Sequence, residues 1–558
     1  MTPIIECVPN FSEGRDPLII QLITNEIETV EGVRLLNVDL GKATNRTVVT
    51  FVGSPAAVIE AAFLAIRKAG ELIDMRRHSG EHPRMGATDV CPLIPISGIT
   101  MAETAQWARK LAERVGNELA IPVYLYEAAQ KDKKRNNLSV IRAGEYEGFQ
   151  EKIKNPEWKP DFGPAFFDEK RGATVIGARD FLVAYNVNLN TTSVRRANSV
   201  AFDVREAGRK KRAGDPVYGE IIKDDLGQPV MIPGSLKSVK AIGWFIKEYG
   251  VAQISMNLTN INITPLHIAF DEVCRKAEAR GLRVTGSELV GLIPLQSLIE
   301  AGKYFLKKQQ RSAGVSEKEL IRMAILTMGL NELTAFKPEE RIIEYLLKDP
   351  QDEKLVSLSL TDFADLTASE SPAPGGGSVA AYLGALGAGL GAMVANLSAQ
   401  KKDWAPFSDW AEKASEYKKE LISLVDADTK AFEGILMARA MPKSTASEDT
   451  IRSATMAAAN LRAIEVPFRV MQVAFQSMEV LKVMAINGNP NSKSDAGVGA
   501  LCARTAVMGA FLNVSINAFG NQSDKNISLI LEQGEKIQAG AIEKEKEILD
   551  LIRLKPKA

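Results

Sequence analysis

The stretch VRLLNVDLGKATNRTVVTFV at residues 33–52, followed by PAAVIEAAFLAIRKAGELIDM at 55–75, decides the fold of the N-terminal region. Its two β-branched runs, Val33–Asp39 and Thr47–Val52, predict two strands close together in the chain. The second stretch opens with a proline, which a helix start tolerates, and repeats apolar residues at helical spacing. It therefore predicts an amphipathic helix.

The segments on either side extend this core into a β-α-β-β-α-β order, which is typical of a split, ferredoxin-like sheet. They are a strand-like run at 4–8, a helical run at 17–30, a helix at 101–117 and a strand at 122–126. The plan recurs, with strand signals at 180–189, 239–246, 251–257 and 282–290 and helical signals at 191–206 and 265–280. We therefore predict an α+β N-terminal half made of two ferredoxin-like subdomains, residues 1–180 and 181–330.

The rest of the chain is different in character. Residues 331–357 are predicted to be a linker. From 358 onward strand signals vanish, and long helical patterns are broken near 402–406, 441–447 and 487–494. We predict an all-α helical-bundle domain over 358–558. The uncharged stretch 375–398 is long enough to cross a bilayer, but glycine and alanine contribute little transfer energy, so we predict a buried helix packed closely against its neighbours.

The overall composition narrows the class of protein. Lys+Arg and Asp+Glu both number 69, which argues against wholesale binding of nucleic acid or membranes. The four cysteines form no CxxC pair, and the N-terminus lacks the basic and apolar regions of a signal peptide. We therefore expect reduced thiols and a cytoplasmic location. With only three histidines and no acidic cluster at metal spacing, we expect no metal site.

Two of the three histidines lie in the Gly/Pro-rich segment Arg77–Asp89. His82 precedes a proline, which disfavours helix, and a loop imidazole beside acids and arginines suits a general base. The alternative is a surface histidine, and these residues alone do not decide between the two. His78 at a helix end is expected to be structural or substrate-orienting, and His267, among apolar helix residues, is expected to be packed in a core.

Polar residues where strands begin or end form a second group of candidates. Asn10, Asp39, Asn45 and Arg46 lie at such positions and are possible substrate-binding residues of a cleft, although turn and cap chemistry favours the same residue types. Further on, a Gly/Pro-broken loop holds three phenylalanines that can stack on a flat heterocycle. Arg171 and Arg179 can pair with carboxylates. The alternative is a loop packed on the core between subdomains.

The helical region has two candidate motifs. Gly375, Gly376, Gly377 and Ser378 lead into the glycine- and alanine-rich helix, whose free N–H groups can bind an anion, or else this loop packs tightly on another helix. The helix glycines at 384, 387, 389 and 391 each cost about 1 kcal/mol, which makes sense only if a second helix or a ligand comes close. Asp426 and Asp428 lie about 200° apart on one helix, so at most one is expected to face the core. We expect that one to be Asp428, with a raised pKa that suits an acid.

Together these strings resemble the formiminotransferase-cyclodeaminase family of bifunctional folate enzymes, over essentially the whole chain and in the family's order. In the first half they are ECVPNFSEG (6–14), TNRTV (44–48), GEHPRMGA (80–87), DFGP (161–164), GAT (172–174) and GAR (177–179). In the second half they are PGGGSVAA (374–381) and VDAD (425–428).

The resemblance implies a folate tunnel between the two ferredoxin-like subdomains, followed by a cyclodeaminase domain. It implies transfer of a formimino group from N-formimino-L-glutamate to N5 of tetrahydrofolate, then ring closure to 5,10-methenyltetrahydrofolate with loss of ammonia. It places the catalytic residues at His82 and Asp428. It places the folate segment at Phe162, Gly163, Pro164, Ala165, Phe166, Phe167, Asp168, Glu169, Lys170 and Arg171.

We accordingly expect an enzyme of histidine degradation and one-carbon metabolism. Its partners are expected to be formiminoglutamate and tetrahydrofolate as co-substrate, in free or polyglutamylated form, with no metal, nucleic acid or membrane. We expect a homo-oligomer built from dimers. Two alternatives remain at this point: a formiminotransferase fused to a methenyltetrahydrofolate cyclohydrolase-like domain, or a non-enzymatic folate-binding scaffold.

Overall fold

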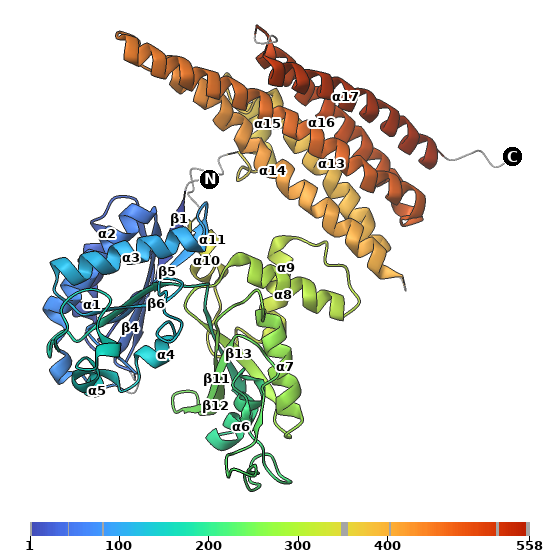
Figure 1. Ribbon diagram of the computed structural model, residues 1–558. Coiled ribbons are helices and arrows are strands. Elements are labelled where there is room, and N and C mark those ends of the chain that lie inside the picture. The colour runs from blue at the N-terminus through green and yellow to red at the C-terminus, as the bar shows by residue number, and fades with distance from the viewer. Residues whose placement is uncertain are drawn as a thin grey trace. The chain divides into compact units, whose positions relative to one another are not determined.

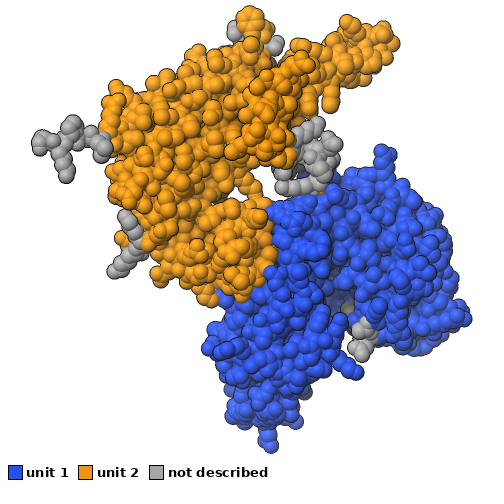
Figure 2. Space-filling view, turned by 180° about the vertical axis from the view of Figure 1, so that it is seen from behind, with its two compact units in different colours: residues 1–297, 328–346 blue, residues 298–327, 347–558 orange. Residues whose placement is uncertain are grey.

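The computed structural model describes residues 3–42, 44–80, 83–347, 355–400, 403–520 and 524–553 (Figure 1). The chain divides into two compact units, which Figure 2 shows in different colours. Unit 1 holds residues 1–297 and 328–346, and unit 2 holds residues 298–327 and 347–558.

The first sheet of unit 1 is built around a ferredoxin-like core. Its strands are β1 Ile4–Cys7, β3 Val33–Gly41, β4 Arg46–Gly53 and β5 Thr88–Ser97, in the order β3-β4-β1-β5. The short strand β2 Asn10–Phe11 lies between β4 and β5. The helices α1 Pro17–Glu28, α2 Pro55–Leu72 and α3 Met101–Glu118 share a core with the inward side chains of the sheet, among them Cys7, Phe11 and Phe51.

The fourth strand of this core is not the one predicted at 122–126. It is β5, whose sequence TDVCPLIPIS contains two prolines that argue against a central strand. The predicted strand exists as β6 Val123–Glu127, but it extends the sheet beyond β5 through parallel pairing with β7 Thr174–Ala178. The strand that completes the core was therefore not predicted, because its two prolines argue against a strand.

The second sheet of unit 1 repeats the same plan. Its strands, β8 Val183–Leu189, β11 Val239–Ile246, β12 Val251–Leu258 and β13 Val284–Val290, lie in the order β11-β12-β8-β13, with helices α6 Val194–Val204 and α7 Leu266–Glu278. This order is equivalent to β3-β4-β1-β5, so the prediction of two ferredoxin-like subdomains is confirmed. A small ribbon of β9 Arg209–Lys210 and β10 Met231–Ile232 is inserted between α6 and β11.

The helices that follow are shared between the units. Most of α8 Leu295–Lys308 and nearly all of α9 Glu317–Met328 belong to unit 2. There the Nζ atoms of Lys303 and Lys307 lie 3.0 and 2.8 Å from the Glu412 carboxylate. The short helices α10 Pro338–Arg341 and α11 Ile343–Leu347 fall within the predicted linker, of which residues 348–354 lie outside the described residues.

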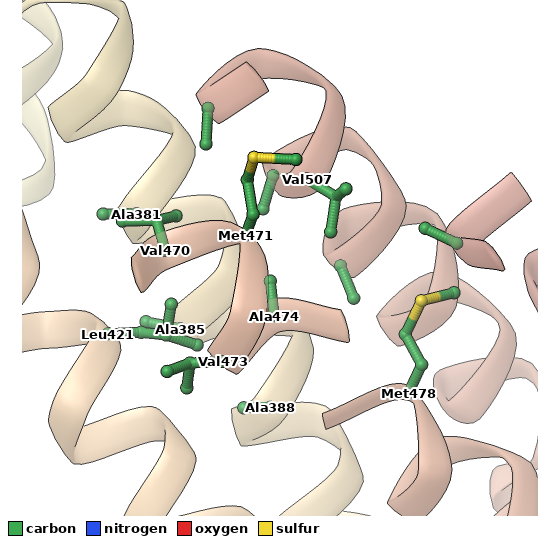
Figure 3. Close-up of a cluster of buried hydrophobic side chains, with 14 of the residues drawn as sticks. Ala381, Ala385, Ala388, Leu421, Val470, Met471, Val473, Ala474, Met478 and Val507 are labelled. Carbon is green, nitrogen blue, oxygen red and sulfur yellow. The ribbon is translucent and has the colours of Figure 1, made fainter. Parts of the chain in front are cut away.

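Unit 2 is a helical bundle, as predicted. Its helices are α12 Leu360–Thr367, α13 Gly376–Ser398, α14 Trp404–Ala440, α15 Ala446–Asn487, α16 Lys493–Ala518 and α17 Lys525–Ile552. The breaks before α14, α15 and α16 fall near the predicted ones, whereas the break between α16 and α17 was not predicted. Alanines and larger aliphatic side chains of α13, α14, α15 and α16 fill the core, with Ala381, Leu421, Met471 and Val507 among those drawn in Figure 3.

The glycines of α13 allow neighbouring helices to come close. A Cβ atom at position 384 would lie 3.2 Å from Leu421, one at 387 would lie 2.8 Å from the Gly499 carbonyl, and one at 391 would lie 3.4 Å from Leu481. The prediction of close helix contacts is confirmed at these three glycines. At Gly389 no helix comes that close, since the nearest atom would be the Lys418 side chain at 4.0 Å, and the alternative of a ligand there stays a prediction.

Among the described residues, α13 and the stretch Pro490–Ala518 are long and apolar enough to cross a membrane. Their most apolar windows are 61% and 44% buried within the protein. Because the core helix of a globular bundle has the same composition, this finding is weak evidence for a span.

Candidate functional site

The first candidate site lies where three neighbouring strands meet. Asn10 of β2 pairs with Val48 of β4 on one side and with Val90 of β5 on the other. Arg46, the first residue of β4, donates from Nε and Nη2 to the Asn10 Oδ1 at 3.1 and 2.7 Å. Its Nη1 forms an ion pair with Asp89 at the start of β5. The register of the sheet therefore brings together polar residues that are up to 79 positions apart.

Charge at this strand junction is not balanced. Asp89 is fully buried, and its carboxylate accepts hydrogen bonds from Arg46, from Nε of Arg142 at 3.2 Å and from the Met85 N–H at 3.0 Å. Burial lowers the pKa of Arg46, and Asp89 opposes that shift. Two guanidinium groups on one carboxylate leave one positive charge in surplus, which suits an anionic substrate. Arg142 was missed by sequence reasoning, because no local pattern distinguishes it from the other arginines.

Asp39 lies on the same face of the sheet as Asn10, since both residues pair directly with Val48 from opposite sides. Burial raises the pKa of Asp39, and the positive charge of Arg341 opposes this rise. Arg341 belongs to α10 and is another residue that sequence reasoning missed. Its distance along the chain, about 300 residues, leaves no local signal.

Asn45 anchors the chain beside the histidine segment. It adopts a left-handed conformation with φ of 48°, and its side chain accepts from the Gly14 N–H at 3.1 Å and donates to the Ser79 carbonyl at 3.0 Å. His78 makes a hydrogen bond from Nε2 to the Asn45 carbonyl at 2.8 Å and accepts one at Nδ1 from Arg84 at 3.2 Å. Burial lowers the pKa of His78, so the neutral imidazole fits these bonds. These bonds fit the structural role predicted for His78, and the alternative role of orienting a substrate stays a prediction.

His82 and Glu81 lie outside the described residues, so the role of His82 stays a prediction from the sequence. A cavity of about 560 Å³ is lined by residues on both sides of them in the chain. One wall holds Glu147, whose Oε1 lies 2.6 Å from Nη2 of Arg84. The full lining is His78, Ser79, Gly80, Arg84, Gly144, Glu145 and Glu147.

The predicted folate segment joins the same region through its C-terminal end. The Arg171 carbonyl accepts the Ala87 N–H at 2.8 Å, and the Ala173 N–H donates to the Met85 carbonyl at 3.0 Å. The Arg171 side chain turns back, with Nε 2.6 Å from Asp168 and Nη1 2.7 Å from the Leu119 carbonyl. The segment therefore runs directly beside the residues that follow His82 in the chain.

The three phenylalanines of this segment point to different places. Phe162 packs on the helix-side core and Phe167 lies 5.8 Å from the ring of Phe149, whereas Phe166 is 53% exposed. Of the three rings, Phe166 is the most available to stack on a heterocycle. Gly163, with φ of 81°, makes the turn that separates them. Pro164 is half-buried, Ala165 and Glu169 are exposed, and Lys170 donates to the Glu71 carbonyl at 2.8 Å.

The second candidate site lies in unit 2, where α13 begins. The Asp428 carboxylate of α14 lies 3.1 Å from the Ser378 hydroxyl and also accepts from the Ser378 backbone N–H. A Cβ atom at Gly377 would overlap this carboxylate, and one at Gly376 would lie 3.6 Å from the Asn513 amide nitrogen of α16. Three helices thus bring together the predicted Gly375–Ser378 motif, Asp428 and Asn513.

Burial raises the pKa of Asp428, and the hydrogen bonds from Ser378 oppose this rise. A raised pKa of Asp428 agrees with the prediction. The expectation that Asp428 is the aspartate that faces the core is wrong, because Asp426 is the buried member of the pair and Asp428 is half-buried. Asp426 is 8% exposed, and its carboxylate accepts the N–H groups of Leu355 and Val356 at 2.8 and 3.4 Å. Both are withdrawn from water in different directions, because α14 is covered on more than one side.

The third histidine of the chain lies where the sequence predicts it. His267 is 8% exposed on α7, as expected for a packed histidine. In the part of the chain that the structure describes, no group of three or more His, Cys, Asp or Glu side chains could hold a metal ion.

Replacing Gly377 with alanine should abolish the chemistry at the second site while leaving the bundle folded. The new methyl group would displace the Asp428 carboxylate, and a misplacement of about 1 Å can cost about 100-fold in rate. The matched control is Gly389→Ala in the same helix, which has room for a methyl group and should gain up to about 1 kcal/mol in stability. The test measures, in both variants, thermal unfolding and the rate of the ring closure that the family resemblance implies. Equal rates of ring closure in Gly377→Ala and Gly389→Ala would contradict the prediction.

Family models match three successive regions of the chain. "Formiminotransferase domain, N-terminal subdomain" covers residues 4–179, "Formiminotransferase domain" covers 184–348 and "Formiminotransferase-cyclodeaminase" covers 359–533.

Curated relatives match the whole chain or one part of it. The formimidoyltransferase-cyclodeaminase of Gallus gallus is 41% identical over 96% of this chain and 97% of its own length. The glutamate formimidoyltransferase of Thermoplasma acidophilum is 42% identical over 54% of this chain and 92% of its own. The methenyltetrahydrofolate cyclohydrolase of Methylorubrum extorquens is 36% identical over 29% of this chain and 80% of its own.

Proposed function

This chain belongs to the formiminotransferase-cyclodeaminase family, and on that premise we propose which of its residues carry the family's two reactions. It is a bifunctional folate enzyme. It transfers the formimino group of N-formimino-L-glutamate to N5 of tetrahydrofolate and releases L-glutamate. It then cyclises 5-formiminotetrahydrofolate to 5,10-methenyltetrahydrofolate and releases ammonia.

The transfer step is proposed to take place beside Asn10, Arg46 and Asp89. N5 of tetrahydrofolate attacks the formimino carbon and loses a proton, and the bond from that carbon to the glutamate nitrogen then breaks. A histidine near its ordinary pKa can accept the first proton and return it to the leaving nitrogen, which is the role proposed for His82. The surplus positive charge of Arg46 and Arg142 over Asp89 supports binding of a carboxylate of the donor.

Ring closure is proposed to use Asp428. N10 attacks the formimino carbon, the imino nitrogen takes up the N10 proton and becomes an amino group, and one further proton allows it to leave as ammonia. A carboxyl group whose pKa is raised by burial is protonated more often at neutral pH and can supply that proton. The observation that carries this assignment is the convergence of Gly377, Ser378 and Asp428 at the start of α13.

The experiment that tests both activities mixes the pure protein with tetrahydrofolate and formiminoglutamate. We expect methenyltetrahydrofolate absorbance to rise together with glutamate and ammonia in equal amounts. The match to a methenyltetrahydrofolate cyclohydrolase makes that activity the second candidate for the helical region. Glutamate release without stoichiometric ammonia, together with hydrolysis of added methenyltetrahydrofolate, would favour it. Tight folate binding without turnover would favour a scaffold.

The pH dependence of ring closure should move when Ser378 is changed to alanine. The Ser378 hydroxyl stabilises the ionised form of Asp428, so its removal raises the pKa of Asp428 further. Since the protonated form is the proposed acid, the alkaline fall of kcat/KM should shift to higher pH. The control is Ser477→Ala, a buried serine of α15 that donates to the Ala474 carbonyl. If the alkaline fall of kcat/KM did not move in Ser378→Ala, or moved to lower pH, Asp428 would not be the acid.

We also propose a cytoplasmic homo-oligomer built from dimers. The expectation of reduced thiols, drawn from four cysteines without a CxxC pair, supports the location. Exposed apolar side chains on the bundle, at 72% for Ile516 and 70% for Leu512 and Met437, support association. Light scattering of the purified chain measures the mass, and a monomer at micromolar concentration would contradict the proposal.

Joining both activities in one chain raises the effective concentration of the intermediate at the second site where the geometry permits.

A further inference from the structure

Lys152, the last residue of helix α5 Glu145–Lys152, donates to three backbone carbonyls. Its Nζ lies 2.9 Å from the Val140 oxygen, 2.6 Å from that of Ile141 and 3.0 Å from that of Ala143. An ammonium group has three hydrogens, so all of its donors are used on this one turn. The acceptors are carbonyls at the end of helix α4 Leu138–Ile141 and just after it, and among them the Val140 oxygen also accepts the Ala143 N–H at 3.3 Å.

The carbonyls that Lys152 binds enclose Arg142 in the chain. Ile141 precedes this arginine and Ala143 follows it, so the backbone is held on both sides of its Cα. The turn after it is tight, with Gly144 at φ of 91° and the Glu145 N–H donating to the Arg142 carbonyl at 2.7 Å. This turn brings the end of α5 back against α4. Lys152 also lies 3.9 Å from the ring centre of Trp158, which fixes the lysine from the other side.

Arg142 in turn is part of the strand junction. Its guanidinium binds the buried Asp89, which also holds Arg46 and the Met85 N–H. Sheet register sets the position of Arg46, whereas Arg142 comes from a short helix outside the sheet. The placement of Arg142, which directly follows α4, therefore depends on the contacts that hold this end of the helix.

We infer that Lys152 is a positioning residue for the transferase site: it clamps the backbone around Arg142 and so delivers the second guanidinium to Asp89. This inference rests on the proposed transferase function. A compact ammonium suits three converging carbonyls better than the planar guanidinium of arginine does.

The test begins with Lys152→Met, which keeps the apolar stem over Trp158 and removes the donors. We expect KM for formiminoglutamate to rise about tenfold or more, with a smaller change in kcat, because a misplaced Arg142 weakens ground-state and transition-state binding alike. Ammonia release from supplied 5-formiminotetrahydrofolate should be unchanged. The matched control is Lys154→Met, since Lys154 is exposed and pairs with Glu151 at 2.7 Å. Wild-type KM in Lys152→Met would overturn the inference.

A double-mutant cycle with Arg142→Gln separates positioning from general destabilisation. If Lys152 acts through Arg142, adding Lys152→Met to Arg142→Gln should cost little further in kcat/KM, whereas additive losses would overturn the inference. Hydrogen exchange of the amides at 138–147 gives a readout that needs no turnover: it should accelerate in Lys152→Met and not in Lys154→Met, and equal exchange would overturn the clamp. If the wild-type chain were inactive while exchange was still accelerated in Lys152→Met, the proposed function would be wrong and the clamp by Lys152 would stand.

Discussion

Asp428→Asn should abolish ammonia release from 5-formiminotetrahydrofolate while glutamate release continues at the wild-type rate. The amide keeps the volume of the side chain, so the close approach to Gly377 and the contact with Ser378 change little. What it loses is the acidic proton, and removal of a general acid costs typically about 10²–10⁴-fold. Rapid measurement of ammonia and of methenyltetrahydrofolate absorbance, starting from the supplied intermediate, gives the rate.

The control for this variant lies two residues away. Asp426 faces the opposite way and binds the Leu355 and Val356 N–H groups. Asp426→Asn should leave the rate of ring closure of the folded protein near normal but lower the free energy of unfolding, by about 1–3 kcal/mol for a buried acceptor whose donors lose their charged partner. If Asp426→Asn stopped ring closure and Asp428→Asn did not, the assignment of the two aspartates would be reversed.

His82→Ala should stop glutamate release and leave ring closure of the supplied intermediate intact. If His82 both accepts the N5 proton and returns it to the leaving nitrogen, its loss should slow transfer by about 10²–10⁴-fold. Glutamate formed from formiminoglutamate and tetrahydrofolate measures the first reaction, and ammonia from 5-formiminotetrahydrofolate measures the second. Because the two reactions are proposed at sites in different units of the chain, the activity of one site shows that a loss at the other is not general misfolding.

His78→Gln is the comparison that isolates His82. His78 is a half-buried neutral imidazole that bonds the Asn45 carbonyl and Arg84, so its replacement should disturb the segment without removing a proton carrier. We expect a loss smaller than that of His82→Ala. A larger loss in His78→Gln, with near-normal transfer in His82→Ala, would move the catalytic role to His78.

The elements of unit 1 could be read largely from periodicity. Alternating β-branched runs and amphipathic segments predicted β3, β4 and α2 and the whole second repeat, because hydrophobic spacing is a local property. The strand β5 was missed because Pro92 and Pro95 argue against a strand, and β6 took its predicted place. Nothing local shows that a neighbouring strand tolerates these prolines.

The sites were predictable to a lesser degree. Asn10, Asn45 and Arg46 were candidates from their positions at strand ends. The structure brings Asn10 and Arg46 together with Asp89, whereas Asn45 bonds Gly14, Ser79 and His78. Arg142 and Arg341 were missed, since each reaches its site by a fold that returns a distant segment. On α14, the angular separation of Asp426 and Asp428 was correct, but which neighbour covers each side of the helix was not available from one helix alone.

By itself the sequence determined the two ferredoxin-like repeats, the helical bundle, the family and the chemical types of the proposed catalytic groups. These follow from spacing along the chain and from motifs of contiguous residues. Tertiary structure alone decided which strand closes the first core, that Arg46 and Arg142 share the buried Asp89, and that α13 presents Gly377 and Ser378 to Asp428. The physical reason is that hydrogen-bond partners, burial and the pKa changes they cause depend on distances in space between residues that the chain keeps far apart.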